Sequence, residues 1–382
     1  MKSVETRELA STVPGTTRRL TIRRYGPDGE AALMRGPKAY IQASLHADEL
    51  PAMLAATHLI RLLDAAEAAG AMQGDVVVLP VANPIGLDQS LVGHHFGRYE
   101  LHSGENFNRD FADLSGEIAA RLKDKLGPDP GENVRLIRAT MMAILDEARP
   151  RGELASLRVM LMREAADADY LLDLHCDDEA LPHLYLGDAR WPDGADLAAE
   201  IGSVAILLTD EAGGGLPFDE AFGNLWALLR VQLGDDYPIP DACLAATVEL
   251  RGQGDVSDEL AAADAAALFR YLQRQGIVAG DPGPLPDPLC EGTRLDGVDM
   301  VRAPVAGIIV YKAELGRVLL AGEVVADILD PLTGRRTPVM TETDGVLFAR
   351  VHHRWIRPGQ HIAKVAGTMP LASRIGAALL DP

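Results

Sequence analysis

The stretch Tyr170-Leu171-Leu172-Asp173-Leu174-His175 is the segment that decides the fold class. Its apolar residues form a nearly continuous run, which is typical of a strand buried on both faces of a sheet. Similar apolar runs lie at 75–81 and 244–250, and apolar residues at helical spacing occur at 51–69 and 259–275. Because strand-like and helix-like segments alternate along the chain, we expect an α/β sandwich.

The composition narrows the class of protein further. The chain has 382 residues, a length that suits two domains or one large domain with an appendage, and its 47% apolar content excludes wholesale disorder. The 36 Lys and Arg against 56 Asp and Glu give a net charge of −20, so nucleic acid and anionic membranes are poor partners. No apolar run reaches membrane-spanning length and no signal peptide is evident, so we expect a cytoplasmic protein. Three cysteines cannot form a disulfide framework.

A proline-rich segment marks the expected domain boundary. Residues 281–288 read Asp-Pro-Gly-Pro-Leu-Pro-Asp-Pro, and alternating prolines favour an extended linker. We therefore expect a main domain at 1–280 and a small all-β domain at 289–382. The small domain contains an internal repeat typical of a two-fold β-sandwich or barrel, and it resembles biotinyl/lipoyl carriers. Carriers of that kind need a modifiable lysine, whereas this chain has Gly334-Arg335-Arg336, so we expect a structural or site-covering module.

Two histidines and a glutamate form the first candidate for chemistry. His46 and Glu49 stand three residues apart between a predicted strand and helix, a weak pattern that a helix-start acid and an exposed histidine would also produce. His175 ends a buried strand, at the sheet edge where ligands bind in open α/β sheets. Together the three residues are a zinc ligand set that leaves a coordination position open, as in catalytic zinc sites. Asp48 is the competing carboxylate, and Asp173 could orient a ligand or be a satisfied core acid.

Glu249 is the candidate general base. It lies in Thr247-Val248-Glu249-Leu250-Arg251, where an apolar frame makes a carboxylate costly unless it has a partner or a task. Beside a metal site it would act as general base and then as proton donor. The competing interpretation is a salt bridge with Arg251.

Asn108 and Arg109 are the candidates for binding a substrate carboxylate. The planar guanidinium of an arginine binds a carboxylate through two parallel hydrogen bonds, and a neighbouring asparagine can add a third. The alternative is a surface ion pair between Arg109 and Asp110.

Two further features carry weaker interpretations. The acidic run Asp177-Asp178-Glu179 reads as a solvated turn, or as a device that attracts cationic substrates. The pair His352-His353 reads as surface, although one of the two could reach the mouth of a pocket.

Taken in order along the chain, these motifs resemble the succinylglutamate desuccinylase/aspartoacylase branch of the zinc-carboxypeptidase superfamily. The resemblance implies a zinc-carboxypeptidase-like α/β/α domain with a mixed sheet. It also implies one zinc ion per chain, held by His46, Glu49 and His175, with Glu249 as general base and acid. Asn108 and Arg109 would bind the α-carboxylate of the substrate. Arg98 would polarise the scissile carbonyl.

The sequence departs from the branch at two motifs. It has His46-Ala47-Asp48-Glu49 where the branch usually has HGDE, and TVELR at 247–251 is closer to peptide-cleaving carboxypeptidases. The expected activity is hydrolysis of a small N-acyl amino acid or related N-acyl amine. The alternatives are a metallocarboxypeptidase and, from another class, a non-catalytic zinc- or ligand-binding protein. The resemblance also leads us to expect a homo-oligomer.

Overall fold

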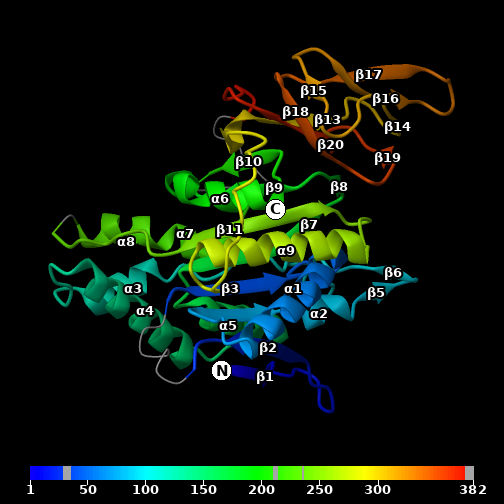
Figure 1. The fold of residues 1–382 in the computed structure, drawn as a ribbon. Coiled ribbons are helices and arrows are strands. Elements are labelled where there is room, and N and C mark those ends of the chain that lie inside the picture. The colour runs from blue at the N-terminus through cyan, green and yellow to red at the C-terminus, as the bar shows by residue number, and fades with distance from the viewer. Residues whose placement is uncertain (29–35, 210–213, 235, 375–382) are drawn as a thin grey trace.

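The main body of the protein is a mixed β-sheet between two layers of helices (Figure 1). The computed structural model describes residues 1–28, 36–209, 214–234 and 236–374. Within them, nine strands form the large sheet in the order β1 (Lys2–Glu8), β2 (Arg19–Tyr25), β4 (Asp75–Leu79), β3 (Lys38–Ala43), β7 (Tyr170–Asp177), β11 (Leu244–Gly252), β9 (His183–Leu186), β10 (Ala205–Leu208) and β12 (Gly292–Arg294).

The centre of the sheet is parallel and its flanks are mixed. Strands β4, β3, β7 and β11 run parallel to one another, whereas β2 and β9 pair antiparallel with their neighbours β4 and β11. The expected strand at 170–175 lies at the middle of this parallel group, which places the end of β7 at the carboxyl edge of the sheet.

Successive residues of β7 point to opposite faces of the sheet, as strand geometry requires. Leu171 packs in the core shared with α3 (Ser115–Leu122), α4 (Pro130–Glu147), α5 (Glu153–Ala165), α7 (Phe218–Gly223) and α8 (Leu225–Leu233). Leu172 and Leu174 pack in the core shared with α1 (Leu50–Ala68), α6 (Trp191–Ile201) and α9 (Asp258–Arg274). The predicted α/β/α sandwich with a mixed sheet is confirmed. Among the described residues, no helix is long and apolar enough to cross a membrane.

The C-terminal part forms a separate β module with its own apolar core. One of its sheets contains β13 (Val298–Arg302), β20 (His361–Gly367), β18 (Gly345–Arg350) and β15 (Val318–Leu319). The other contains β17 (Arg336–Met340), β16 (Val324–Leu329), β14 (Gly307–Tyr311) and β19 (Trp355–Ile356). The expected small all-β region is therefore present as two packed sheets.

Two short strands each pair with a sheet in the other part of the protein. Strand β12 follows the proline-rich segment in sequence, but it pairs with β10 and so extends the large sheet. Strand β8 (Glu179–Ala180) comes directly after β7, but it pairs with β18 of the module. The module is thus attached through backbone hydrogen bonds just beyond the central strand of the large sheet.

Candidate active site

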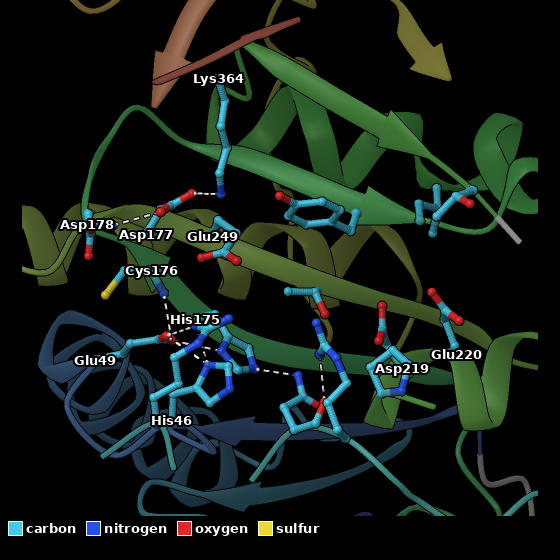
Figure 2. Close-up of a pocket in the computed structure, with 18 of the residues that line it drawn as sticks. His46, Glu49, His175, Cys176, Asp177, Asp178, Asp219, Glu220, Glu249 and Lys364 are labelled. Carbon is cyan, nitrogen blue, oxygen red and sulfur yellow. Dashed lines mark hydrogen bonds and ion pairs between the residues drawn. The ribbon is translucent and has the colours of Figure 1, made fainter. Parts of the chain in front are cut away.

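All seven residues selected from the sequence line a single cavity of about 380 Å³ at the carboxyl edge of the parallel strands (Figure 2). They are His46, Glu49, Arg98, Asn108, Arg109, His175 and Glu249. The turn after β3 supplies the first two, β7 supplies His175 and β11 supplies Glu249. The folded chain therefore brings together residues that are up to about 200 positions apart in the sequence.

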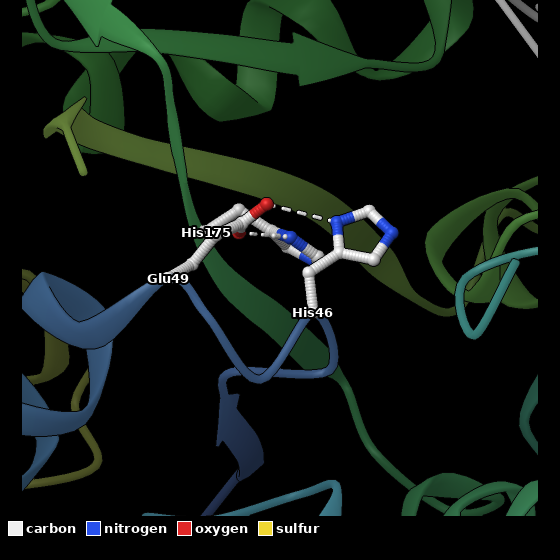
Figure 3. A group of neighbouring side chains, drawn as sticks. All are labelled: His46, Glu49 and His175. Atoms are coloured by element: carbon white, nitrogen blue, oxygen red, sulfur yellow. Dashed lines mark hydrogen bonds and ion pairs between the residues drawn. The ribbon is translucent and has the colours of Figure 1, made fainter. Parts of the chain in front are cut away.

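His46, Glu49 and His175 form a compact buried group (Figure 3). The Glu49 carboxylate lies between the two rings, with Oε1 2.9 Å from His46 Nδ1 and Oε2 2.7 Å from His175 Nδ1. Each of the three residues is no more than 4% exposed. One donor atom from each residue lies within 4.8 Å of the other two, so the group is able to hold a metal ion.

The outer nitrogen of each imidazole ring is also held. His46 Nε2 lies 2.9 Å from Asn106 Oδ1, and His175 Nε2 lies 3.1 Å from Asp173 Oδ2. Asp173 Oδ1 in turn accepts a hydrogen bond of 2.9 Å from Gln42 Nε2. Such partners fix which ring nitrogen faces the metal and strengthen it as a ligand. Asp173 was considered from the sequence, whereas Asn106 was missed although it belongs to the same loop as Asn108.

The Glu49 carboxylate stays ionised between the two rings. Burial works to raise the pKa of Glu49, but the adjacent His175 and His46 hold it well below its ordinary value. The donor set is therefore a carboxylate and two imidazoles whose Nδ1 atoms face it, which is the chemistry that zinc prefers. Asp48, the competing carboxylate, lines the cavity but lies outside this group. The nitrogen and oxygen donors of His46, Glu49 and His175 therefore fit a zinc ion.

Arg98 lies against the same group. Its Nη1 is 3.2 Å from His46 Nδ1 and 3.7 Å from Glu49 Oε1. A guanidinium in this position can reach an oxygen that develops negative charge beside the His46, Glu49 and His175 group.

Glu249 faces the cavity next to His175, its register partner across β11 and β7. The salt bridge with Arg251 that the sequence allowed does not form, because Arg251 pairs with Asp264. Glu249 Oε2 is buried and has no hydrogen-bond partner among the described residues. Burial, with the negative charge of Glu49, raises the pKa of Glu249 to about 8. The structure thus leaves an oxygen of Glu249 available for a proton.

Asn108 and Arg109 are buried, so the surface alternative for Arg109 is excluded. Asn108 Nδ2 lies 3.4 Å from His175 Nε2, and its Oδ1 accepts a hydrogen bond of 2.9 Å from the Phe218 backbone N–H. The Nη1 of Arg109 donates to the Asn108 carbonyl oxygen at 2.7 Å. Burial and the positive charge of Arg98 lower the pKa of Arg109, which indicates that an anion would be favoured beside it.

The acidic run that follows His175 is not a solvated turn, because the β module pairs with each of its carboxylates. Asp177 binds the Nζ of Lys364 from β20, and Figure 2 shows Lys364 reaching down from the module into the cavity. Asp178 Oδ1 lies 3.2 Å from His352 Nδ1. Glu179 binds Arg350 at 2.6 Å and Arg354 at 2.5 Å. The partners lie more than 170 positions further along the chain, so no local pattern could have revealed them.

Among the described residues of the β module, four line the cavity: Met300, His352, His361 and Lys364. The expectation that His352 or His353 could reach the mouth of a pocket is therefore met by His352. The same contacts make the module part of the cavity wall.

Left-handed backbone occurs next to three of the site motifs. Ser44 has φ 61° two residues before His46, Asp110 has φ 57° directly after Arg109, and Arg251 has φ 86° two residues after Glu249. Non-glycine residues rarely adopt this conformation, and it often marks functional sites. At Arg251 it accompanies a register shift between β11 and β7, which turns the chain away just after Glu249. Ala47, where the related motif has glycine, does not have positive φ.

The mixed sheet, with a cavity lined by ionisable side chains at the ends of its parallel strands, defines an α/β protein with a candidate active site at its carboxyl edge. The succinylglutamate desuccinylase/aspartoacylase catalytic domain matches residues 35–274, which is more than half of the chain. The chain therefore belongs to this deacylase family, as its motifs suggested. A comparison with curated proteins found no significant match.

Solved structures support the fold over nearly the whole chain. A succinylglutamate desuccinylase/aspartoacylase family protein from Shewanella amazonensis is 24% identical with a TM-score of 0.83, over 95% of this chain and 98% of that one. A similar protein from Shewanella frigidimarina is 23% identical with a TM-score of 0.81, over 96% and 97%. The ectoine utilization protein EutE (DoeB) from Ruegeria pomeroyi, solved with bound product, is 16% identical with a TM-score of 0.65, over 96% and 95%. These likenesses extend through the β module.

Proposed function

We propose that the protein is a zinc-dependent amidohydrolase that removes the acyl group from a small N-acyl amino acid or related N-acyl amine. The observation that carries this proposal is the position of Glu249, whose buried oxygen faces the cavity beside the His46, Glu49 and His175 group. In this proposal, residues 1–280 form the catalytic domain, and residues 289–382 complete the wall of the pocket.

His46, Glu49 and His175 would hold one zinc ion per chain. When bound there, zinc supplies Lewis-acid polarisation of a carbonyl and lowers the pKa of water. Asn106 and Asp173 keep the two imidazole rings oriented for this task through their Nε2 atoms.

Glu249 would move the proton during hydrolysis. Its carboxylate takes a proton from the attacking water, and the resulting carboxylic acid gives that proton to the nitrogen of the departing amine. A carboxyl whose pKa is raised by burial suits both steps, because it accepts and releases a proton near neutral pH. This assignment explains why a carboxylate without a salt bridge is present in an apolar strand.

Arginine side chains would bind the charged parts of the substrate. Arg98 lies close enough to the metal-binding group to donate to the carbonyl oxygen as it gains negative charge. Arg109, with Asn108, would bind the α-carboxylate of the amino-acid portion. The amide to be cleaved would then lie between Arg109 and the metal-binding group.

The β module favours a deacylase over a carboxypeptidase. Met300, His352, His361 and Lys364 form part of the cavity wall, and a peptide needs an open groove. A cavity of about 380 Å³ suits a small N-acyl amino acid.

The test combines metal content with amine release. Purified protein is analysed for zinc and assayed for amine release from N-acyl amino acids and dipeptides, beside Glu249→Gln. We expect equal zinc content in both proteins, with at least one ion per chain, and release from acyl amino acids by the wild type alone. Preference for dipeptides would favour the carboxypeptidase. Zinc without any turnover would favour the non-catalytic binding protein.

A further inference from the structure

A second group of metal-binding side chains lies where the β module meets the main body. Asp178 follows β7, and His352 and His353 follow β18 of the module. One donor atom from each residue lies within 4.8 Å of the other two, and the set again consists of two imidazoles and one carboxylate. We propose that Asp178, His352 and His353 bind a divalent transition-metal cation such as Zn²⁺, at a site distinct from the His46, Glu49 and His175 group.

The pattern of charge pairing across the junction singles out this position. The acids on either side of Asp178 are matched by permanent cations, Asp177 by Lys364 and Glu179 by two arginines. Asp178 faces imidazole instead, with its Oδ1 3.2 Å from His352 Nδ1. An imidazole is not a permanent cation, so a bound metal ion would complete at Asp178 the neutralisation that lysine and arginine provide at its neighbours.

The two histidines are suitable ligands. Their rings lie edge to face with centroids 5.7 Å apart, so they do not stack against each other. Burial lowers the pKa of His353, and this outweighs the opposite effect of Asp178, so the neutral imidazole that metals need is favoured. Nitrogen and carboxylate donors of this kind suit zinc and its neighbours in the first transition series.

A metal ion bound by these three residues would lie at the wall of the cavity. Asp178 and His352 both line the cavity, whereas His353 does not. An ion held by all three would join the main body to the module at the cavity wall. We expect weaker binding than at the buried group, because the His352 side chain is 59% exposed and the ligands are less rigidly held.

The test measures cation stoichiometry in the full-length protein. Zn²⁺ is titrated calorimetrically into wild type, His353→Ala and His94→Ala. His94 and His95 are a second exposed pair of adjacent histidines, and no third donor joins them in a cluster within the described residues, so His94→Ala is a matched control. We expect wild type and His94→Ala to bind one equivalent more than His353→Ala. Because only this difference matters, the result does not depend on occupancy of the buried group.

Melting temperatures distinguish a lost metal site from a folding defect in the variant. Excess Zn²⁺ should raise the melting temperature of wild type more than that of His353→Ala, while the two proteins melt alike when metal is removed. Equal stoichiometry in wild type and His353→Ala would overturn the proposal, as would equal loss of an equivalent in His94→Ala.

Discussion

Glu249 and His175 are direct register partners on the neighbouring parallel strands β11 and β7. The pairing places the only carboxylate of the TVELR strand beside a residue of the metal-binding group, and the backbone hydrogen bonds of the sheet maintain that position. A rigid sheet, rather than a mobile loop, therefore sets the spacing between the proposed base and the proposed metal ligand.

Replacement of Glu249 by glutamine should abolish turnover while leaving metal binding intact. The amide has nearly the shape of the carboxylate but cannot accept and return the proton, so we expect a loss of roughly 10² to 10⁴ in kcat. Elemental analysis and steady-state assays would measure the two properties. Glu259→Gln, an exposed position on α9, should retain full activity. A Glu249→Gln enzyme with near wild-type turnover would remove Glu249 from the mechanism.

Replacement of Asp173 by asparagine should weaken zinc binding by about 10- to 100-fold, because the negative charge beside His175 Nε2 is lost. Competition with a chromogenic chelator measures the affinity. Asp258→Asn is the matched control, since Asp258 also contacts a histidine, His58, at 2.8 Å, but neither residue lines the cavity. Unchanged affinity in Asp173→Asn would show that Asp173 is a core acid with no role at the metal.

Replacement of Lys364 by methionine should destabilise the protein by about 3 kcal/mol, because it leaves the largely buried carboxylate of Asp177 without its cation. Denaturant unfolding measures the change, and adding Asp177→Asn should recover part of the loss. Arg317→Met removes an ion pair with Glu323 on the module surface, and it should cost less than about 1 kcal/mol. Equal losses in the two single variants would contradict the buried character of the Lys364 pair.

His183 should make stability fall as the pH decreases. Burial lowers the pKa of this fully buried residue to about 4, although Asp177 works in the opposite direction. In the unfolded chain His183 becomes protonated as the pH falls below 6.5. In the folded chain it stays neutral down to about pH 4, so the folded state loses stability over this range.

Between pH 7 and pH 5 this effect amounts to roughly 2 kcal/mol. The measurement is the free energy of unfolding of wild type and His183→Gln at both values. The wild type should lose more stability than the variant, whereas exposed His94→Gln should follow the wild type. Parallel pH profiles for wild type and His183→Gln would show that His183 titrates normally in the folded protein.

Much of the fold and of the candidate site could be predicted because the key polar residues lie toward the ends of apolar strands. His175 and Glu249 lie in apolar runs that do not alternate with polar residues, which indicates a sheet buried on both faces. The carboxyl ends of parallel strands in such a sheet lie along the same edge. Positions far apart in the sequence could therefore be expected to meet there.

The remainder depends on contacts between distant segments, which carry no local signal. Asp178 and Glu179 read as solvated because their partners His352, Arg350 and Arg354 lie in the module. For the same reason the pairing of β8 with β18 could not be foreseen, since a two-residue strand has no recognisable pattern.

The spacing of the metal-binding group along the chain has a consequence for how the protein matures. Glu49 and His175 are separated by 126 positions, and their side chains meet because β3, which leads into the turn that carries Glu49, pairs with β7. A nascent chain that ends before β7 has only part of the donor set. Under the proposed function, binding of a metal by all three residues would follow the pairing of β3 with β7, and a chaperone that acts earlier on this chain would handle a metal-free form.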